Sequence, residues 1–116
     1  ILDFVETHVD GSDLSNNVLC RAVVRIDEKT IPIGSKGNGP LDAFVSALKQ
    51  VEEVSPFTVS AFSEHSVGSG SDTDAISYVE LSFKDDKKIW GVGRSPNVAR
   101  AGINAVVSAL NVYFKL

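Results

Sequence analysis

Residues 18–33 read VLCRAVVRIDEKTIPI, and this stretch decides the fold class. Apolar side chains occupy every second position from Cys20 to Ile26, with arginines at two of the positions between them. A period of two is typical of a β-strand that is buried on one side only. The polar residues 27–29 then predict a hairpin turn, followed by a short return strand over residues 30–33.

The same pattern returns 58 residues later. A shift of that length, half of the 116-residue chain, aligns the turn RIDEKTI (25–31) with FKDDKKI (83–89). Each half then reads as strand, strand, short strand and helix. The other predicted strands are 2–9, 57–67, 74–83 and 89–92. We therefore predict an α+β fold made by internal duplication. Two βββα units, residues 1–56 and 57–116, form a single domain with helices behind antiparallel sheets.

Each predicted helix begins at a proline. Gly39-Pro40 opens the first helix, and Ser95-Pro96 opens the second with Ser95 as the N-cap and Pro96 at the first helical position. The second helix is apolar on two sides. One side has small residues, Ala101, Gly102, Ala105 and Ala109, and the other has bulky residues, Ile103, Val106, Val107, Leu110 and Tyr113. A helix with two apolar sides needs two partners, which favours a homodimer over the alternative of a closed monomeric sandwich.

Composition excludes several classes of protein. With 43% hydrophobic and 22% charged residues, the chain has the composition of a folded globular domain. The net charge of −4 disfavours binding to nucleic acid or to an anionic membrane. No apolar run is as long as a membrane-spanning helix. The single cysteine, Cys20, excludes an internal disulfide and fits a cytoplasmic protein. Because the chain has no Met and begins with Ile1, we expect a fragment of a longer protein.

The inventory of catalytic residues is small. The two histidines, His8 and His65, form no HxH or HExxH pair, and the chain contains neither CxxC nor GxSxG. We therefore expect no catalytic residue, no metal site and no cofactor in this fragment.

Two glycine-containing segments precede the predicted helices, SKGNGPLDA (35–43) and GVGRSPNVA (91–99). The N–H groups at a helix start attract carboxylate or phosphate, although neither segment matches a P-loop or a dinucleotide fingerprint. Capping and turn geometry explain the same glycines. Asp42 is similarly open to two interpretations, as an acceptor for the ammonium group of an amino acid or as a complement to the helix dipole.

Three segments taken together resemble a known family: GNGPLDAFVSAL (37–48), EHSVGSGSDTDAISYVEL (64–81) and WGVGRSPNVARAGINAVVSALN (90–111). They are similar to the C-terminal regulatory domain of 2-isopropylmalate synthase, also called the LeuA dimerisation domain. The resemblance implies a dimer of two βββα units per chain that mediates allosteric feedback inhibition of leucine biosynthesis by L-leucine. The alternatives are the isoleucine-sensing domain of citramalate synthase, which shares this domain type, and a structural dimerisation module without an effector.

The resemblance also implies that catalysis takes place elsewhere. An N-terminal TIM barrel of the same chain, absent from this fragment, would condense acetyl-CoA with 2-oxoisovalerate using a divalent metal. The expected partners are therefore the L-leucine or L-isoleucine effector, a second copy of the chain and that barrel. Carried over by position, the effector site comprises Gly37, Asn38, Gly39, Pro40, Leu41, Asp42, Glu64, His65, Ser71, Pro96 and Asn97.

Overall fold

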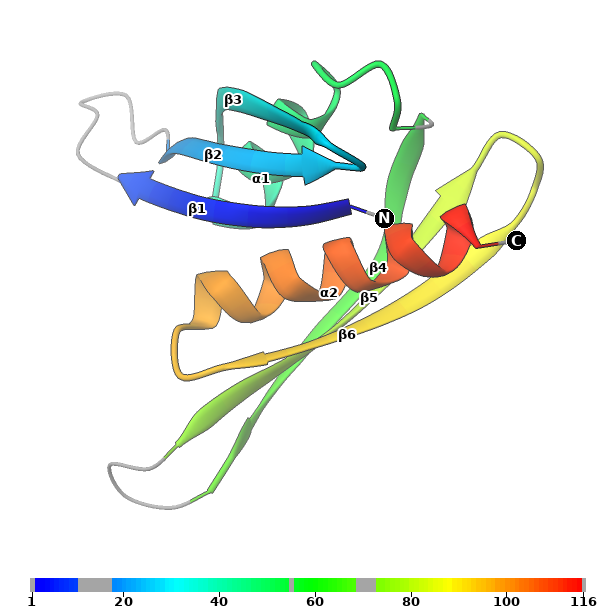
Figure 1. The fold of residues 1–116 in the computed structure, drawn as a ribbon. Helices are drawn as coiled ribbons and strands as arrows, with labels where there is room; N and C mark the ends of the chain where they lie inside the picture. The colour runs from blue at the N-terminus through cyan, green and yellow to red at the C-terminus, as the bar shows by residue number, and fades with distance from the viewer. Residues whose placement is uncertain (1, 11–17, 55, 69–72, 116) are drawn as a thin grey trace. The chain divides into compact units, whose positions relative to one another are not determined.

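The computed structural model describes residues 2–10, 18–54, 56–68 and 73–115, with side chains from residue 18 onward. The element order is strand, strand, strand, helix, and then the same again. The chain divides into two compact units, residues 1–55 and 56–116. Each unit has a three-stranded antiparallel sheet and one helix, so the fold is mixed α/β with two sheets and two helices (Figure 1). An ancestral duplication stays a prediction.

The first unit consists of β1 (Leu2–Asp10), β2 (Val18–Ile26), β3 (Lys29–Gly37) and α1 (Pro40–Leu48). Its strands lie in the order β1-β2-β3, and α1 packs against β2 and β3. The alternation predicted for β2 is confirmed by a set of buried side chains at every second position: Cys20, Ala22, Val24 and Ile26. Four buried residues of α1, Ala43, Phe44, Ala47 and Leu48, belong to the same core, as do Ile33, Val51 and Val54.

β3 is longer than the sequence indicates. The predicted strand ended at Ile33, whereas β3 continues to Gly37, which pairs with Val18 of β2. Its second half contains polar residues and lacks the apolar alternation that marks a strand in the sequence. The backbone N–H and C=O groups of β2 need hydrogen-bond partners, whatever the side chains of β3 are. The pairing of β3 with β2 therefore continues to Gly37. On the outer edge of β3, the side-chain amide of Gln50 donates from Nε2 to the carbonyl of Gly34 at 2.5 Å.

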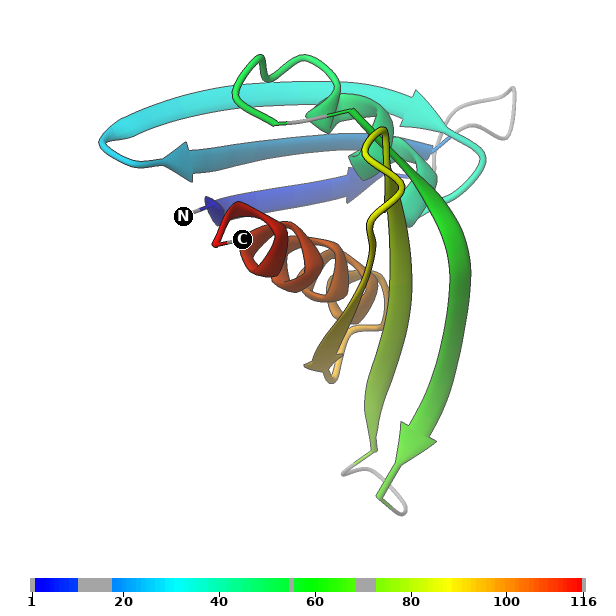
Figure 2. The same ribbon diagram turned by 90° about the vertical axis from the view of Figure 1, so that its right-hand side faces the viewer.

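The second unit consists of β4 (Phe57–Val67), β5 (Asp74–Phe83), β6 (Lys88–Ser95) and α2 (Val98–Phe114). β5 is the central strand, and α2 runs along β5 and β6 on one face of the sheet (Figures 1 and 2). The residues of β5 that face α2 are buried: Ala75, Ser77, Val79, Leu81 and Phe83. On the opposite face, Trp90 and Val92 of β6 are 53% and 51% exposed.

Gly91 and Gly93 are strand residues, although the segment GVGRSPNVA was a candidate glycine-rich turn before the helix and the predicted strand included only Gly91. Both lie within β6, which spans Lys88–Ser95 rather than 89–92, and both face α2. A β-carbon on Gly91 would collide with the carbonyl oxygen of Ala105, and one on Gly93 would collide with that of Ala101. The glycines therefore allow the backbones of β6 and α2 to touch, which explains them through packing and not through anion binding.

The two hairpin turns differ in length but share one backbone feature. In the first, Ile26 pairs with Lys29 and Asp27 has a φ of 55°. In the second, the N–H of Phe83 donates to the carbonyl of Lys87 at 2.9 Å, and Asp86 has a φ of 65°. Aspartate tolerates this left-handed conformation better than most residues, so the acidic turn residues fit their positions.

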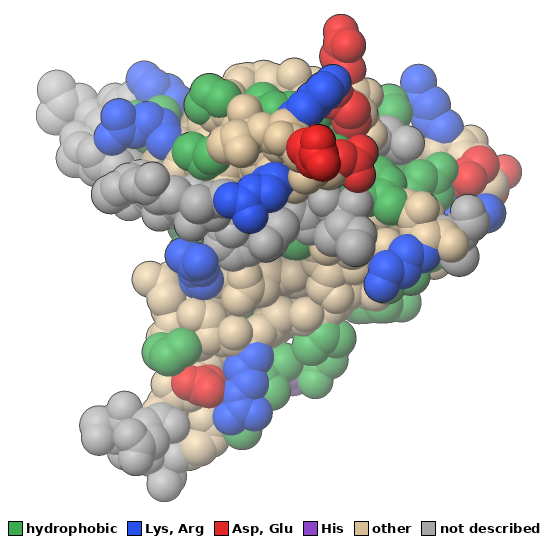
Figure 3. Space-filling model, viewed as in Figure 1, with side chains coloured by type: hydrophobic (Ala, Val, Ile, Leu, Met, Phe, Trp, Pro, Cys, Tyr) green, Lys and Arg blue, Asp and Glu red, His purple; other side chains and the backbone are tan. Residues whose placement is uncertain are grey.

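No helix among the described residues is both long and apolar enough to cross a membrane. On the face drawn in Figure 3, the Lys and Arg side chains of the described residues lie in several separate places with acidic side chains among them.

Candidate functional site

The six predicted site residues of the first unit, residues 37–42, run from the last residue of β3 through the turn at Asn38 and Gly39 into the first turn of α1. Gly39 is the N-cap of α1, Pro40 follows it, and the N–H of Ala43 donates to the Gly39 carbonyl at 2.9 Å. Because Gly39 has no side chain, it provides no cap for the N–H groups of the first helical turn. Such groups have no partner inside the helix, and they form a favourable environment for an anion.

Gly37 and Gly39 are glycine for different reasons. A β-carbon on Gly37 would lie 2.5 Å from Asp42 Oδ2 and 2.6 Å from the nitrogen of Ala43, so the packing of the turn itself excludes a side chain. A β-carbon on Gly39 would meet nothing within 4 Å. The backbone of Gly39 is extended (φ −159°, ψ 175°), a conformation that any residue adopts. Neither strain nor packing within the chain thus requires glycine at position 39, and its absent side chain leaves open space beside the helix start.

Asp42 is already engaged in this turn. Its Oδ2 accepts a hydrogen bond from the backbone N–H of Asn38 at 3.0 Å. Asp42 also lies in the first turn of α1, where the helix dipole favours a negative charge. Asp42 therefore has two structural roles: it complements the helix dipole, and its hydrogen bond to Asn38 closes the turn.

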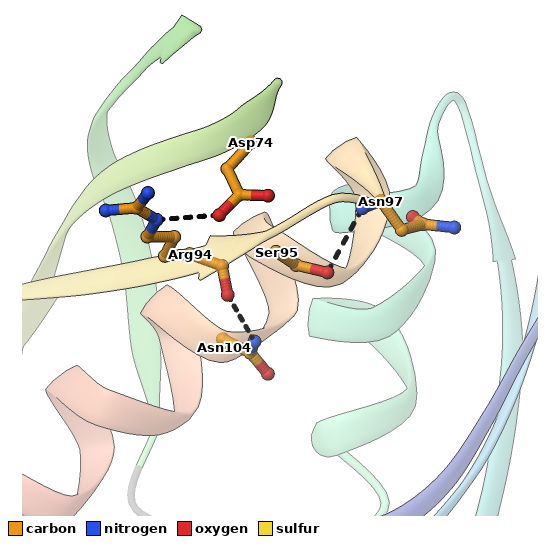
Figure 4. Close-up of polar contacts among 5 residues, drawn as sticks. All are labelled: Asp74, Arg94, Ser95, Asn97 and Asn104. Carbon is orange, nitrogen blue, oxygen red and sulfur yellow. Dashed lines mark hydrogen bonds and ion pairs between the residues drawn. The ribbon is translucent and has the colours of Figure 1, made fainter. Parts of the chain in front are cut away.

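The start of α2 is organised differently, and here the predicted cap was wrong. Asn97, not Ser95, is the N-cap, and its Oδ1 accepts from the N–H of Arg100 at 3.0 Å. Ser95 still pairs with Ala75 in the sheet, so it cannot be the cap, and Pro96 lies before the helix instead of at its first position. The hydroxyl of Ser95 accepts instead from the N–H of Asn97 at 3.1 Å (Figure 4).

Side chains around this second start are bound to one another or to the backbone of the unit. Arg94 Nε donates to Asp74 Oδ2 at 2.8 Å and thereby links β6 to β5 (Figure 4). Asn104 Nδ2 donates to the Arg94 carbonyl at 3.4 Å and links α2 to β6. The segment GVGRSPN thus has a structural explanation within the second unit.

The two helix starts occupy equivalent places in the repeat. Their N-caps, Gly39 and Asn97, are separated by 58 residues, the same shift that aligns the turns. Asn97 satisfies a first-turn N–H with its own side chain, whereas Gly39 cannot. The start of α1 is therefore the one whose first-turn donors lack a side-chain cap from the N-cap residue.

The remaining predicted site residues belong to the second unit. Glu64 and His65 lie on β4, both exposed, opposite Ser77 and Ile76 of β5. They point to opposite faces of the sheet because they are consecutive strand residues. The ring of His65 contacts that of Tyr78 edge-on at a centroid distance of 5.9 Å.

β5 separates Glu64 and His65 from Pro96 and Asn97, which follow β6. These four residues therefore do not form one cluster within their unit. Ser71 lies outside the described residues.

Other candidate chemistry is sparse. Among the described residues, no three His, Cys, Asp or Glu side chains gather as a possible metal site. Burial raises the pKa of the Cys20 thiol, which disfavours the thiolate that a nucleophile needs. A shallow pocket of about 240 Å³ at Phe57 and Phe83 contains none of the predicted site residues.

Ser77 is a buried polar residue that was not among the predicted site residues. Its side chain is fully buried beneath α2, and its hydroxyl has no hydrogen-bond partner among the described residues. The position between Ala75 and Val79 in an alternating strand was the available signal, since it predicts that this polar side chain faces the core.

Residues 4–114 match the family described as the LeuA allosteric (dimerisation) domain. The chain belongs to this family. It is 46% identical over 112 residues to a 2-isopropylmalate synthase of Brucella suis, a match that covers 95% of this chain and 20% of that protein.

Two further relatives carry the same name. A 2-isopropylmalate synthase of a Parafrankia species is 44% identical over 88 residues, 76% of this chain and 15% of its own length. The enzyme of that name from Saccharomyces cerevisiae is 38% identical over 93 residues, again 76% of this chain and 15% of the relative. The chain therefore spans between 15% and 20% of the length of these relatives. It corresponds to a regulatory domain of proteins so named.

Proposed function

We propose that this chain is the leucine-responsive regulatory and dimerisation domain of a 2-isopropylmalate synthase. Its membership of the LeuA allosteric domain family supports this assignment, as do the names of its relatives. The condensation of acetyl-CoA with 2-oxoisovalerate, with its divalent metal, would belong to the part of the protein outside this chain. The chain itself would bind the effector and a second copy of itself.

The start of α1 is the observation on which the effector site rests. In the proposed complex, the carboxylate of leucine accepts hydrogen bonds from the uncapped first-turn N–H groups, favoured by the positive end of the helix. The space beside Gly39, where a β-carbon would meet nothing within 4 Å, leaves room for the amino acid. Glu64, His65, Ser71, Pro96 and Asn97 stay predicted effector contacts from the family resemblance.

Calorimetric titration of the 116-residue chain with leucine, isoleucine and valine tests the proposal. We expect leucine to bind most tightly. A preference for isoleucine would identify the domain as the citramalate synthase type. No heat with any of the three would indicate a structural dimerisation module.

A pair of glycine variants locates the site. Gly39→Val places a branched side chain in the open space and should abolish leucine binding. Gly34→Ala is the control. A β-carbon at position 34 would make contacts no closer than 3.4 Å, and this position lies in β3, before the turn. Equal loss of binding in both variants would point to a general effect of glycine replacement and away from a site at residue 39.

We further infer that inhibition is a linkage effect. Leucine would favour one arrangement of the domain, and the catalytic part of the same chain would respond to that arrangement. Dimerisation is supported by the family description and by Trp90 and Val92, exposed apolar residues of the kind that association buries. Sedimentation equilibrium at micromolar concentration should give twice the mass of the chain, and a monomer both with and without leucine would contradict this.

A further inference from the structure

We propose that Asp42 is a positioning residue for the effector site, whose carboxylate holds the turn at Asn38 and does not bind the effector's ammonium group. This inference rests on the proposed function, since the turn in question is the proposed effector site. It assigns Asp42 the task of keeping the start of α1 open and ordered.

The Asp42 carboxylate already has a partner in the turn. The bond from the Asn38 N–H to Asp42 Oδ2 is 3.0 Å long and bridges residues four apart in the chain. Asp42 is the third residue of α1, and a carboxylate at this place in a helix commonly reaches back to the N–H groups before the helix. The contact therefore fixes the direction in which the chain enters α1.

The turn also fits closely around the Asp42 carboxylate. A β-carbon on Gly37 would lie 2.5 Å from Oδ2 of Asp42 and 2.9 Å from the α-carbon of Ala43. Gly37 thus provides the space in which the Asp42 carboxylate lies against the turn. A side chain at position 37 would displace the Asp42 carboxylate, so the position of Asp42 depends on the glycine.

The second unit holds its helix start in a different way. There the helix start is held by the N-cap side chain, through Asn97 Oδ1 and the N–H of Arg100 at 3.0 Å, and the third helical residue is an arginine. At α1 the roles are reversed: the third residue, Asp42, holds the turn, and the N-cap has no side chain. The start of α2 has the N-cap half of a capping box, whereas the Asp42 carboxylate at α1 reaches one residue beyond the N-cap Gly39, to the N–H of Asn38. Only the arrangement at α1 orders the turn while leaving the N-cap position empty.

The contact with Asn38 occupies Asp42 without any part played by the effector. The N–H of Asn38 is directed at Asp42 and is not available to a ligand, so the carboxylate of the effector would meet the first-turn donors of α1 instead. A role as ammonium acceptor needs the negative charge of Asp42. A role in positioning needs only an oxygen acceptor at the same place, and asparagine provides one.

Two variants and two ligands distinguish the roles. Asp42→Asn keeps a side-chain oxygen and loses the charge, while Asp42→Ala loses both. The ligands are leucine and 4-methylpentanoate, which has the same carbon skeleton and carboxylate but no amino group. Binding is measured by NMR titration, which also reports weak affinities, and amide hydrogen exchange of Asn38 is recorded for each variant.

We expect Asp42→Asn to bind leucine within about threefold of the parent and to keep the Asn38 amide protected. Asp42→Ala should bind both ligands roughly tenfold more weakly, by similar factors, as expected for the loss of one hydrogen bond to a charged group. Its Asn38 amide should exchange faster.

The opposite results would overturn the inference. If Asp42→Asn loses leucine as severely as Asp42→Ala while 4-methylpentanoate is unaffected, then Asp42 binds the ammonium group. If Asp42→Ala binds both ligands like the parent, then the contact with Asn38 has no role in the site. If the parent chain binds no leucine, the proposed function fails and the effector role of Asp42 fails with it, but Asn38 exchange still decides whether Asp42 holds the turn.

Discussion

Replacing Gly39 by asparagine should stabilise the domain and at the same time weaken effector binding. Asn97 shows how such a cap works, since its Oδ1 accepts from the N–H three residues later at 3.0 Å. The equivalent donor at α1 is the N–H of Asp42. The extended backbone of Gly39 and the open space around it allow an asparagine side chain without strain. Once capped, that N–H is no longer available to a carboxylate.

Two contributions determine the gain in the free energy of unfolding. Asparagine is a better N-cap than glycine by roughly 0.3 kcal/mol. Removing glycine also restricts the unfolded chain, which contributes about 0.4–1 kcal/mol. Together they raise the melting temperature by roughly 2–6 °C for a domain of this size. The loss of one hydrogen bond to the effector's carboxylate costs about 1.5–3 kcal/mol, which weakens binding roughly ten- to hundredfold.

Thermal unfolding without ligand and calorimetric titration with leucine measure the two effects. Gly39→Ala is the control, because it adds a β-carbon without an acceptor. This variant should not gain the cap and should keep more of the leucine affinity than Gly39→Asn. An asparagine variant that melts higher yet binds leucine like the parent would refute the reasoning, because the carboxylate would then lie elsewhere than at the start of α1.

Three further substitutions test the packing. Ser77→Ala removes a buried hydroxyl without a described partner and should raise stability by about 1 kcal/mol in urea unfolding; a loss of stability would reveal a partner for the hydroxyl. Gly93→Ala should lower stability by about 1–3 kcal/mol or prevent folding, because its β-carbon would collide with the backbone of α2, and a neutral result would contradict that contact. Asp86→Gly should raise stability by about 0.5–1 kcal/mol, since glycine adopts the φ of 65° without strain; an unchanged denaturation midpoint would mean that Asp86 makes a compensating contact.

The sequence predicted the elements whose side chains follow a simple period. β2 and β5 were found with the bounds expected, because burial on one face imposes an alternation that can be read directly. The ends of β3 and β6 could not be predicted in this way. Their last residues are polar or glycine, and they are strand residues only because β2 and β5 provide backbone partners.

The start of α2 shows a second limit. Ser95, Pro96 and Asn97 are all residue types that occur at helix starts, so local preference does not choose between them. Which residue becomes the N-cap depends on where β6 ends, and Ser95 is still paired with Ala75 in the sheet. At α1 the sequence placed Gly39-Pro40 correctly, but it did not reveal that Asp42 would bond to Asn38, since that contact depends on the conformation of the turn.

The contact of α2 with Gly91 and Gly93 limits how the helix can move relative to the sheet of the second unit. Two residues of a strand advance about 6.6 Å, and four residues of a helix advance about 6.0 Å, so the two backbones have nearly matching periods. The helix backbone meets the strand at Ala105 and Ala101, one such period apart. Small sliding movements would drive a helix carbonyl into the strand, and a shift by a whole period would place one against Ile89 or Ser95, which carry side chains on the same face of β6. Helix and sheet should therefore move as a single piece, and any signal that crosses this unit would travel as its rotation or translation and not as a deformation inside it.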